Sequence, residues 1–518
     1  MEKNRYSTDW RYLKKGQIPP RIELNTLQSE RNLTMSRAKK ATSKSKKTKH
    51  SRKSQPCESN NKYQLNRALK WFFKEVSFDD CRFHGNTSWR PTDMIILALL
   101  WIWSGQKNVT AAFDDAVIQS NKLLGRVAVT TYQGLAKALT TWTSDLITVM
   151  KAKIHKCLQS IGGRNFRVGR WVPLAVDGSR TTAPRTVSNE KAFCAKDYGK
   201  GKTAKYRKGK NKKKKHRKNE NKLTPPQIWV TLMWHMGLNV PWDWKLGPSN
   251  ASERGHAREM IANGDFVKNT LFVGDAGFVG YEFWTTILNR KQEFMVRVGG
   301  NVHLLKNLNA YTERGKKGIV YCWPAAAMKK RKPPLVLRLV KCKVGKTNVY
   351  LLTSVLSEAQ LTRTEMAKLY ELRWGIELEF RSLKQIFERR TLRCRNSDRA
   401  LVELEWSIMG MAIIELFTLQ EQRVRKGQKI DPRKISFAKS LRAVRQSLTY
   451  LSNRPDTVLD FATQLAQALT DNYTRASDKS ARYRCKRKKP PSCGKPKVAR
   501  ADAVRRRILK ETDFTTAV

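Results

Sequence analysis

The spacing of apolar residues changes near Arg170, and this change most constrains the fold. Before it, from Tyr63 to about Lys153, apolar residues recur every three to four positions, the spacing of one face of an α-helix. After it, short apolar runs such as "RWVPLAVDGS", "PPQIWVTLMWHMG" and "TLFVGDAGF" have the length of buried strands, and segments with helical spacing separate them. This order predicts an α/β core with a mixed sheet, preceded by a helical domain.

The charge of the chain indicates a polyanionic partner. Lysine and arginine number 103 against 43 acidic residues, which gives a formal net charge of +60. Folding does not require this imbalance, and self-repulsion opposes it, whereas nucleic acid would compensate it and release counterions on binding. An anionic membrane surface is the weaker alternative.

Other sequence features exclude several classes of protein. The longest apolar run, "MIILALLWIW", is too short to span a bilayer, and "MEKNRYSTDW" lacks the apolar core of a signal peptide. The nine cysteines form no C-x-x-C pair, so neither a zinc site nor a disulfide framework is indicated. We therefore expect reduced thiols, no membrane partner and a cytoplasmic location.

Shifts in composition divide the chain into five parts. We expect a basic disordered tail over 1–60, a helical domain over 61–165, the α/β domain over 166–425, a C-terminal helical region over 426–475 and a basic tail over 476–518. Strand-like pieces predict a β-rich insertion over about 299–355. A lysine-rich loop over 200–222 is interpreted as a segment that binds DNA backbone, with a plain solvated insertion as a nearly equal alternative.

Three acidic residues stand where a charge is costly. Asp177 follows the apolar run "VPLAV", and Asp275 follows "TLFVG", so each is expected at the end of a buried strand. Glu377 lies in "KLYELRWGIELEFRSLKQIF", which predicts one long helix from about Thr364 to Glu388. Two aspartates on neighbouring strands and a glutamate from a facing helix can hold two Mg²⁺ ions with a phosphate between them.

Each of these acids has an ordinary structural interpretation when taken alone. An Asp-Gly pair after a strand is most often a turn, and Glu377 could pair with Arg373 or Arg381 on a helix surface. Together, in this order and in so basic a chain, they favour a metal site for phosphodiester chemistry. Tyr370, Arg373, Glu377 and Lys384 also share one side of the predicted helix, at offsets of 0, 3, 7 and 14.

These motifs resemble the three acidic signatures of DDE transposases of bacterial insertion sequences. The resemblance rests on "LAVDGS", "VGDAGFVGYEFW" and "YELRWGIELEFRSLK" and covers roughly Arg170 to Arg389. The last segment fits the Y-x2-R-x3-E-x6-K signature of the IS-four family without departure. The resemblance implies a ribonuclease H-like mixed-sheet core and a catalytic, metal-binding set of Asp177, Asp275 and Glu377.

The resemblance also implies partners and a reaction. Tyr370, Arg373 and Lys384 would contact the DNA of the transposon end, and two Mg²⁺ ions, with Mn²⁺ able to take their place, would be the cofactors. The enzyme would act as a homodimer on two terminal inverted repeats, cleaving the strands and joining the 3′-hydroxyl to target DNA in cut-and-paste transposition. The location would be the cytoplasm of a bacterium, at the nucleoid.

Two further features depend on the same resemblance. The helical domain over 61–165 matches in position the end-recognition domain of such transposases. Its segment "TTYQGLAKALTTW" could read DNA, although a packing helix is about as consistent with its residues. Members of the family commonly flip a base out of a hairpin end onto an aromatic side chain, for which Trp284 and Trp323 are candidates. A core position is favoured for both tryptophans.

Two alternatives to a transposase remain open from the residues. One is a non-catalytic basic DNA-binding protein, such as a domesticated transposase, in which substitution of the three acids would leave function intact. The other is a metal-dependent nuclease on the same core that cuts DNA without joining it. The stripe of Tyr370, Arg373, Glu377 and Lys384 argues against the nuclease, because the family resemblance gives those residues the task of holding a transposon end.

Overall fold

The computed structural model describes residues 62–194, 225–311, 317–345, 347–427, 431–453, 460–471 and 493–511. The chain divides into two units, Met1–Glu58 and Ser59–Val518, and all described residues belong to the second. The expected N-terminal tail over 1–60 and the lysine-rich loop over 200–222 lie outside the described residues. Within the described part of the chain, no helix is both long and apolar enough to cross a membrane.

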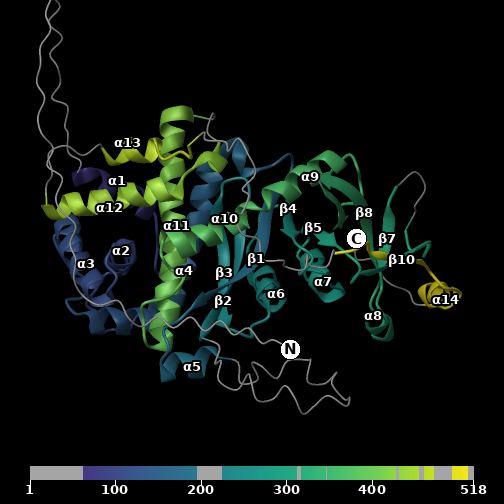
Figure 1. Ribbon diagram of the computed structural model, residues 1–518, viewed down its shortest axis with the longest axis horizontal. Helices are drawn as coiled ribbons and strands as arrows, with labels where there is room; N and C mark the ends of the chain where they lie inside the picture. The colour runs from purple at the N-terminus through teal and green to yellow at the C-terminus, as the bar shows by residue number, and fades with distance from the viewer. Residues whose placement is uncertain are drawn as a thin grey trace, which may run out of the picture. The chain divides into compact units, whose positions relative to one another are not determined.

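A ten-stranded mixed sheet runs through this unit in the order β10-β6-β7-β8-β9-β5-β4-β1-β2-β3 (Figure 1). Strand β2 pairs antiparallel with both β1 and β3, whereas β4 pairs parallel with β1 and β5 pairs parallel with β4. The mixed α/β class expected from the sequence is therefore confirmed. The strands are β1 (Val172–Thr182), β2 (Gln227–His235), β3 (Val240–Pro248), β4 (Thr270–Gly274), β5 (Glu293–Val298), β6 (His303–Lys306), β7 (Ile319–Cys322), β8 (Leu335–Val344), β9 (Thr347–Thr353) and β10 (Lys497–Arg500).

The expected β-rich insertion extends the same sheet. Strands β6 to β9 fall within 299–355, and β9 pairs antiparallel with both β5 and β8, so hydrogen bonding is continuous from the core into the insertion. Strand β10 comes from the range expected to be a basic tail, yet it pairs in parallel with β6 at the far edge. It is followed by α14 (Ala503–Glu511), an arginine-rich helix with no buried residue among those described.

Helices from both ends of the chain pack together beside β3 (Figure 1). The indole of Trp103 donates to the Gly410 carbonyl at 3.1 Å, and the indole of Trp406 donates to the Thr143 hydroxyl at 2.9 Å. The N-terminal and C-terminal helices therefore share one core. They are α1 (Lys62–Phe73), α2 (Pro91–Trp103), α3 (Val109–Leu124), α4 (Tyr132–Gly162), α11 (Ser397–Lys426), α12 (Phe437–Asn453) and α13 (Phe461–Ala466).

Shorter helices connect and cover the strands. Helix α6 packs against β1, β2 and β3, α7 packs against α6 and β5, α9 packs against β8, and α10 packs against β1. Their bounds are α5 (Val187–Phe193), α6 (Glu253–Asn263), α7 (Tyr281–Asn289), α8 (Ala325–Lys329), α9 (Arg363–Leu372) and α10 (Gly375–Arg381), followed by a π-helical turn, η3 (Ser382–Ile386).

The prediction of one long helix from about Thr364 to Glu388 is wrong in detail, because this segment is divided into α9, α10 and η3. The amide of Glu377 donates to the Trp374 carbonyl at 3.1 Å, three residues back, so the helix tightens at this point. Gly375, the first residue of α10, lies against β2, because a Cβ atom there would collide with the ring of Trp234. The missing side chain lets α10 lie directly against the sheet.

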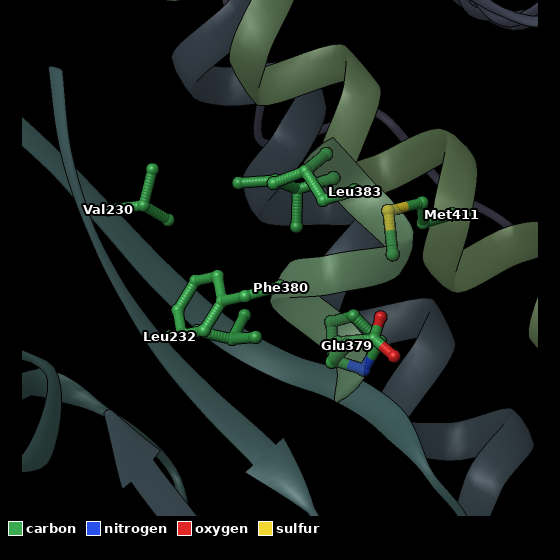
Figure 2. Close-up of a pocket in the computed structure, with 8 residues that line it drawn as sticks. Val230, Leu232, Glu379, Phe380, Leu383 and Met411 are labelled. Atoms are coloured by element: carbon green, nitrogen blue, oxygen red, sulfur yellow. The ribbon is translucent and has the colours of Figure 1, made fainter. Parts of the chain in front are cut away.

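The space behind α10 is almost completely filled. Between β2, α10 and α11 there is a cavity of only about 10 Å³, lined by apolar side chains and Glu379 (Figure 2). That volume is at the lower limit for one water molecule. The cavity is therefore a small packing gap, and the side chains around it hold α10, the helix that carries Glu377, against the sheet.

Candidate active site

The register of the sheet brings Asp177 and Asp275 side by side. The last paired positions of β1 and β4 are Ala175 and Val273, and each aspartate lies two residues farther along its strand direction. Neighbouring strands are about 5 Å apart, so the two carboxylates leave the sheet at the same edge. This is the point where parallel strands end and polar groups can gather without breaking the ladder.

The position of Asp177 differs from the expectation in one respect. It was expected at the end of its strand, whereas β1 continues beyond it to Thr182. The continuation is explained by β2, which pairs with β1 through Thr182 after β4 has ended. Asp177 thus lies within β1, with one strand edge paired and the other open toward Asp275.

Arg373 joins the aspartate strand to Glu377. Its Nη1 lies 3.9 Å from Oδ2 of Asp177, and its Nη2 lies 3.3 Å from Oε1 of Glu377. The arginine is 7% exposed, while the Glu377 side chain is 36% exposed. The sequence analysis raised an Arg373–Glu377 ion pair on a helix surface as the ordinary alternative. The pair exists, but its arginine is buried and also contacts Asp177.

The other two residues of the predicted stripe also reach this region. Tyr370 is buried, and the Arg373 guanidinium lies over its ring at 5.4 Å from the centroid. Lys384, on the π-helical turn, donates from Nζ to the Ser179 hydroxyl at 2.5 Å, two residues beyond Asp177 on β1. Arg373 and Lys384 thus contact β1 directly, and Tyr370 and Glu377 each contact Arg373.

The electrostatics reflect several acids near one another. Burial is the main cause that raises the pKa of Asp177 from 3.8 to about 6, and the charges of Asp275 and Glu377 add to it. The Gly178 amide, which donates to Asp177 Oδ1 at 2.9 Å, and the Arg373 guanidinium oppose the rise. Burial likewise lowers the pKa of Lys384 from its usual range.

A fourth acid at this site was not identified from the sequence. Burial, followed by the charges of Asp177 and Asp275, raises the pKa of Glu253 from 4.5 to about 7. Glu253 is the first residue of α6, a position where an acid ordinarily interacts with the helix dipole. The sequence offered no signal to separate that ordinary role from a place beside two aspartates.

An exposed aromatic residue was also missed. Trp374, between α9 and α10, is 58% exposed, and Leu378 one turn later is 44% exposed. By contrast, the two aromatic candidates from the sequence are buried: Trp284 stacks on Phe294 at 5.4 Å between ring centroids, and Trp323 is 3% exposed. The core position favoured for Trp284 and Trp323 is thus the one that the structure has.

The donors of this site suit a hard divalent cation. Asp177, Asp275, Glu377 and Glu253 all offer carboxylate oxygens, the ligands that Mg²⁺ and Mn²⁺ prefer. Among the described residues, however, no three such side chains converge in the arrangement that would hold a metal ion. Two of the carboxylates, Asp177 and Glu377, contact Arg373 instead.

The region that carries this site corresponds to a known family. Residues 172–413 match the transposase DDE domain family. The match begins at β1, ends within α11 and includes all of the candidate site residues. It supports a DDE transposase, a class of DNA-cleaving and strand-transfer enzymes that generally use divalent metals.

Two further comparisons were made. A cryo-EM structure of the piggyBac transposase synaptic complex with hairpin DNA is similar to this chain at 14% identity and a TM-score of 0.36. The similarity covers 81% of this chain and 85% of that one. No curated protein matches the sequence.

Proposed function

We propose that the protein is a DDE transposase of the IS-four type that carries out cut-and-paste transposition. The observation that supports it most directly is that Asp177 and Asp275 follow the last paired residues of β1 and β4 side by side. Arg373 contacts both Asp177 and Glu377 and so links Glu377 to the same region. The strand order β3-β2-β1-β4-β5, with three antiparallel strands followed by two parallel ones, supports a ribonuclease H-like core.

Asp177, Asp275 and Glu377 would hold the divalent ions. Bound metal would lower the pKa of an attacking water or 3′-hydroxyl and stabilise the leaving oxygen of an in-line displacement. The carboxylates position that chemistry at the edge of the sheet, with α10 packed too tightly against β2 for Glu377 to move far. The first reaction is hydrolysis at the element's end; in the second, the freed 3′-hydroxyl attacks target DNA and displaces its 3′-oxygen.

Tyr370, Arg373 and Lys384 would hold the DNA end. Arg373 has a buried Nε without a hydrogen-bond partner among the described residues, so its guanidinium retains donor capacity beyond its two acidic contacts. Bidentate pairing with a phosphate is the contact that this fork geometry favours. Lys384 adds a positive charge next to Ser179, and Tyr370 supports the Arg373 guanidinium from its ring face.

Trp374 is the aromatic residue best placed to stack on a DNA base. It adjoins Arg373 in sequence and is exposed, whereas Trp284 and Trp323 are buried. A base flipped out of a duplex or hairpin end needs an accessible π-face. The chain would act in the cytoplasm as a homodimer that joins two inverted repeats to a target.

The deciding experiment uses the purified full chain, a supercoiled plasmid carrying the genomic segments that flank the coding sequence, and Mg²⁺. We expect excised and strand-transfer products that disappear in Glu377→Ala but persist in Glu358→Ala, an exposed acid upstream of α9. Cleavage without joined products would favour a nuclease. DNA binding without any cleavage would favour a non-catalytic DNA-binding protein. Products that persist in Glu377→Ala would refute the role proposed for Glu377.

A further inference from the structure

Glu253 lies between Gly178, which follows Asp177, and Gly277, which follows Asp275. A Cβ atom built on Gly178 would be 2.5 Å from Oε1 of Glu253, so the carboxylate occupies the place that a side chain next to Asp177 would need. A Cβ atom built on Gly277, two residues after Asp275, would be 3.9 Å from the other oxygen, Oε2. One oxygen of Glu253 therefore lies near each of the two chain segments that carry the aspartates.

The glycine after Asp177 is explained by this contact. Gly178 lies within β1 and pairs with Thr231, so an unusual backbone conformation is not the reason for it. Its missing side chain instead leaves room for the Glu253 carboxylate and for the ring of Trp229. The Asp-Gly pair, which in sequence is most often a turn, here admits a third carboxylate to the edge of β1 and β4.

A role in the helix alone does not account for this placement. Ser252 already caps α6 by accepting from the Gly255 amide at 3.1 Å, and a first-turn acid gains its dipole interaction equally well in solvent. Glu253 is instead drawn in against two other acids, and none of the ion pairs among the described residues includes it. Carboxylates gathered in this way require a cation to offset their repulsion and desolvation.

We propose that Glu253 is a fourth carboxylate ligand of the divalent site, binding together with Asp177 and Asp275 on the side opposite α10. The assignment rests on the proposed function, because it takes the metal to be the divalent ion of a DDE enzyme. It gives the two aspartates a ligand that approaches from α6, whereas Glu377 approaches from α10. Among the ion pairs of the described residues, Arg373 contacts Asp177 and Glu377 but not Glu253.

The test is Mn²⁺ binding to the full chain without DNA, measured by titration calorimetry and by the loss of the free-Mn²⁺ electron paramagnetic resonance signal. Glu253→Gln keeps the shape of the side chain and removes its charge, and we expect at least a tenfold loss of affinity, comparable to the loss in Asp177→Asn. Gly178→Ala, which places a methyl group against Glu253 Oε1, should weaken binding in the same direction. Glu282→Gln, in the first turn of α7, is the matched control and should bind as the wild type does.

The outcomes separate the two proposals. If Asp177→Asn loses Mn²⁺ while Glu253→Gln binds with wild-type affinity, Glu253 is not a ligand and the proposed function still stands. If the wild type has no Mn²⁺ site that responds to Asp177→Asn, both proposals are refuted. Circular dichroism and thermal unfolding confirm that each variant is folded, and Glu253→Asp, which shortens the side chain but keeps its charge, should give an intermediate affinity.

Discussion

Replacing Asp177 by asparagine should stabilise the metal-free protein at neutral pH. The carboxyl has a pKa of about 6 in the folded chain against an ordinary value of 3.8. At 1.36 kcal/mol per pKa unit, this shift corresponds to about 3 kcal/mol of unfolding free energy. The side chain is 20% exposed, so solvent screens little of the effect. Asparagine keeps an oxygen that can accept from the Gly178 amide but carries no charge.

The sign follows from proton binding. Because the folded state holds the Asp177 proton more tightly than the unfolded state, wild-type stability falls as pH rises from about 4 to about 6. Asp177→Asn lacks this loss, so the two proteins should be equally stable near pH 3.5 and should differ fully above pH 6.5. For the roughly 380 residues that the structure describes, about 3 kcal/mol corresponds to roughly 4 °C in Tm.

The measurement is thermal and urea unfolding in EDTA from pH 4 to 8, repeated with Mg²⁺. Mg²⁺ should raise the Tm of the wild type and leave Asp177→Asn unchanged, because only a site with ionised ligands gains from binding. Asp265→Asn, an exposed aspartate, serves as the control. If Asp177→Asn were no more stable than the wild type at pH 7.5 in EDTA, the inference that burial of this carboxylate is costly would be wrong.

Three other substitutions test separate parts of the structure. Trp374→Ala should weaken binding of hairpin-ended DNA about tenfold, the range for one stacked base, in fluorescence anisotropy, while Leu378→Ala changes it little; equal losses would indicate a general apolar contact. Glu403→Ala leaves Arg389 buried without its acidic partner and should cost about 3–5 kcal/mol in urea unfolding, where a cost under about 1 kcal/mol would contradict the buried pair. Glu379, with a pKa raised by burial to about 8, hydrogen-bonds Glu415. Glu415→Gln should therefore lessen the fall in unfolding free energy from pH 5 to pH 8. An unchanged dependence of stability on pH would refute the raised pKa of this buried pair.

Local sequence patterns were enough to select the three candidate acids that the structure places in one region. Asp177 and Asp275 were visible because each follows an uninterrupted apolar run, and Glu377 because helical spacing placed it with Tyr370, Arg373 and Lys384. Those patterns depend only on neighbours in the chain. The α/β class and the β-rich insertion were accessible for the same reason, since strand length and helical spacing are both local properties.

The features that the sequence missed depend on contacts between distant residues. The extent of β1 past Asp177 is set by its pairing with β2, and the close approach of α10 to the sheet depends on the contact of Gly375 with Trp234. Glu253 had the appearance of an ordinary first-turn acid in the sequence. Its carboxylate occupies the space left by the missing side chain of Gly178, a contact between distant residues that no local pattern shows. Strand β10 could not be foreseen, since its partner β6 lies far back along the chain.

Arg373 connects the electrostatics of the site with the proposed reaction. In a chain of net charge +60, the acids of the site have one arginine in contact with both Asp177 and Glu377, and the guanidinium is nearly inaccessible to solvent. A buried arginine that holds two carboxylates can be released only if another cation neutralises them. The same residue is the one proposed to contact a phosphate of the DNA end in a bidentate manner. A metal ion that neutralises Asp177 and Glu377 would free Arg373 to bind phosphate, and a phosphate bound to Arg373 would free the two carboxylates to bind metal. Metal binding and DNA binding should therefore strengthen each other.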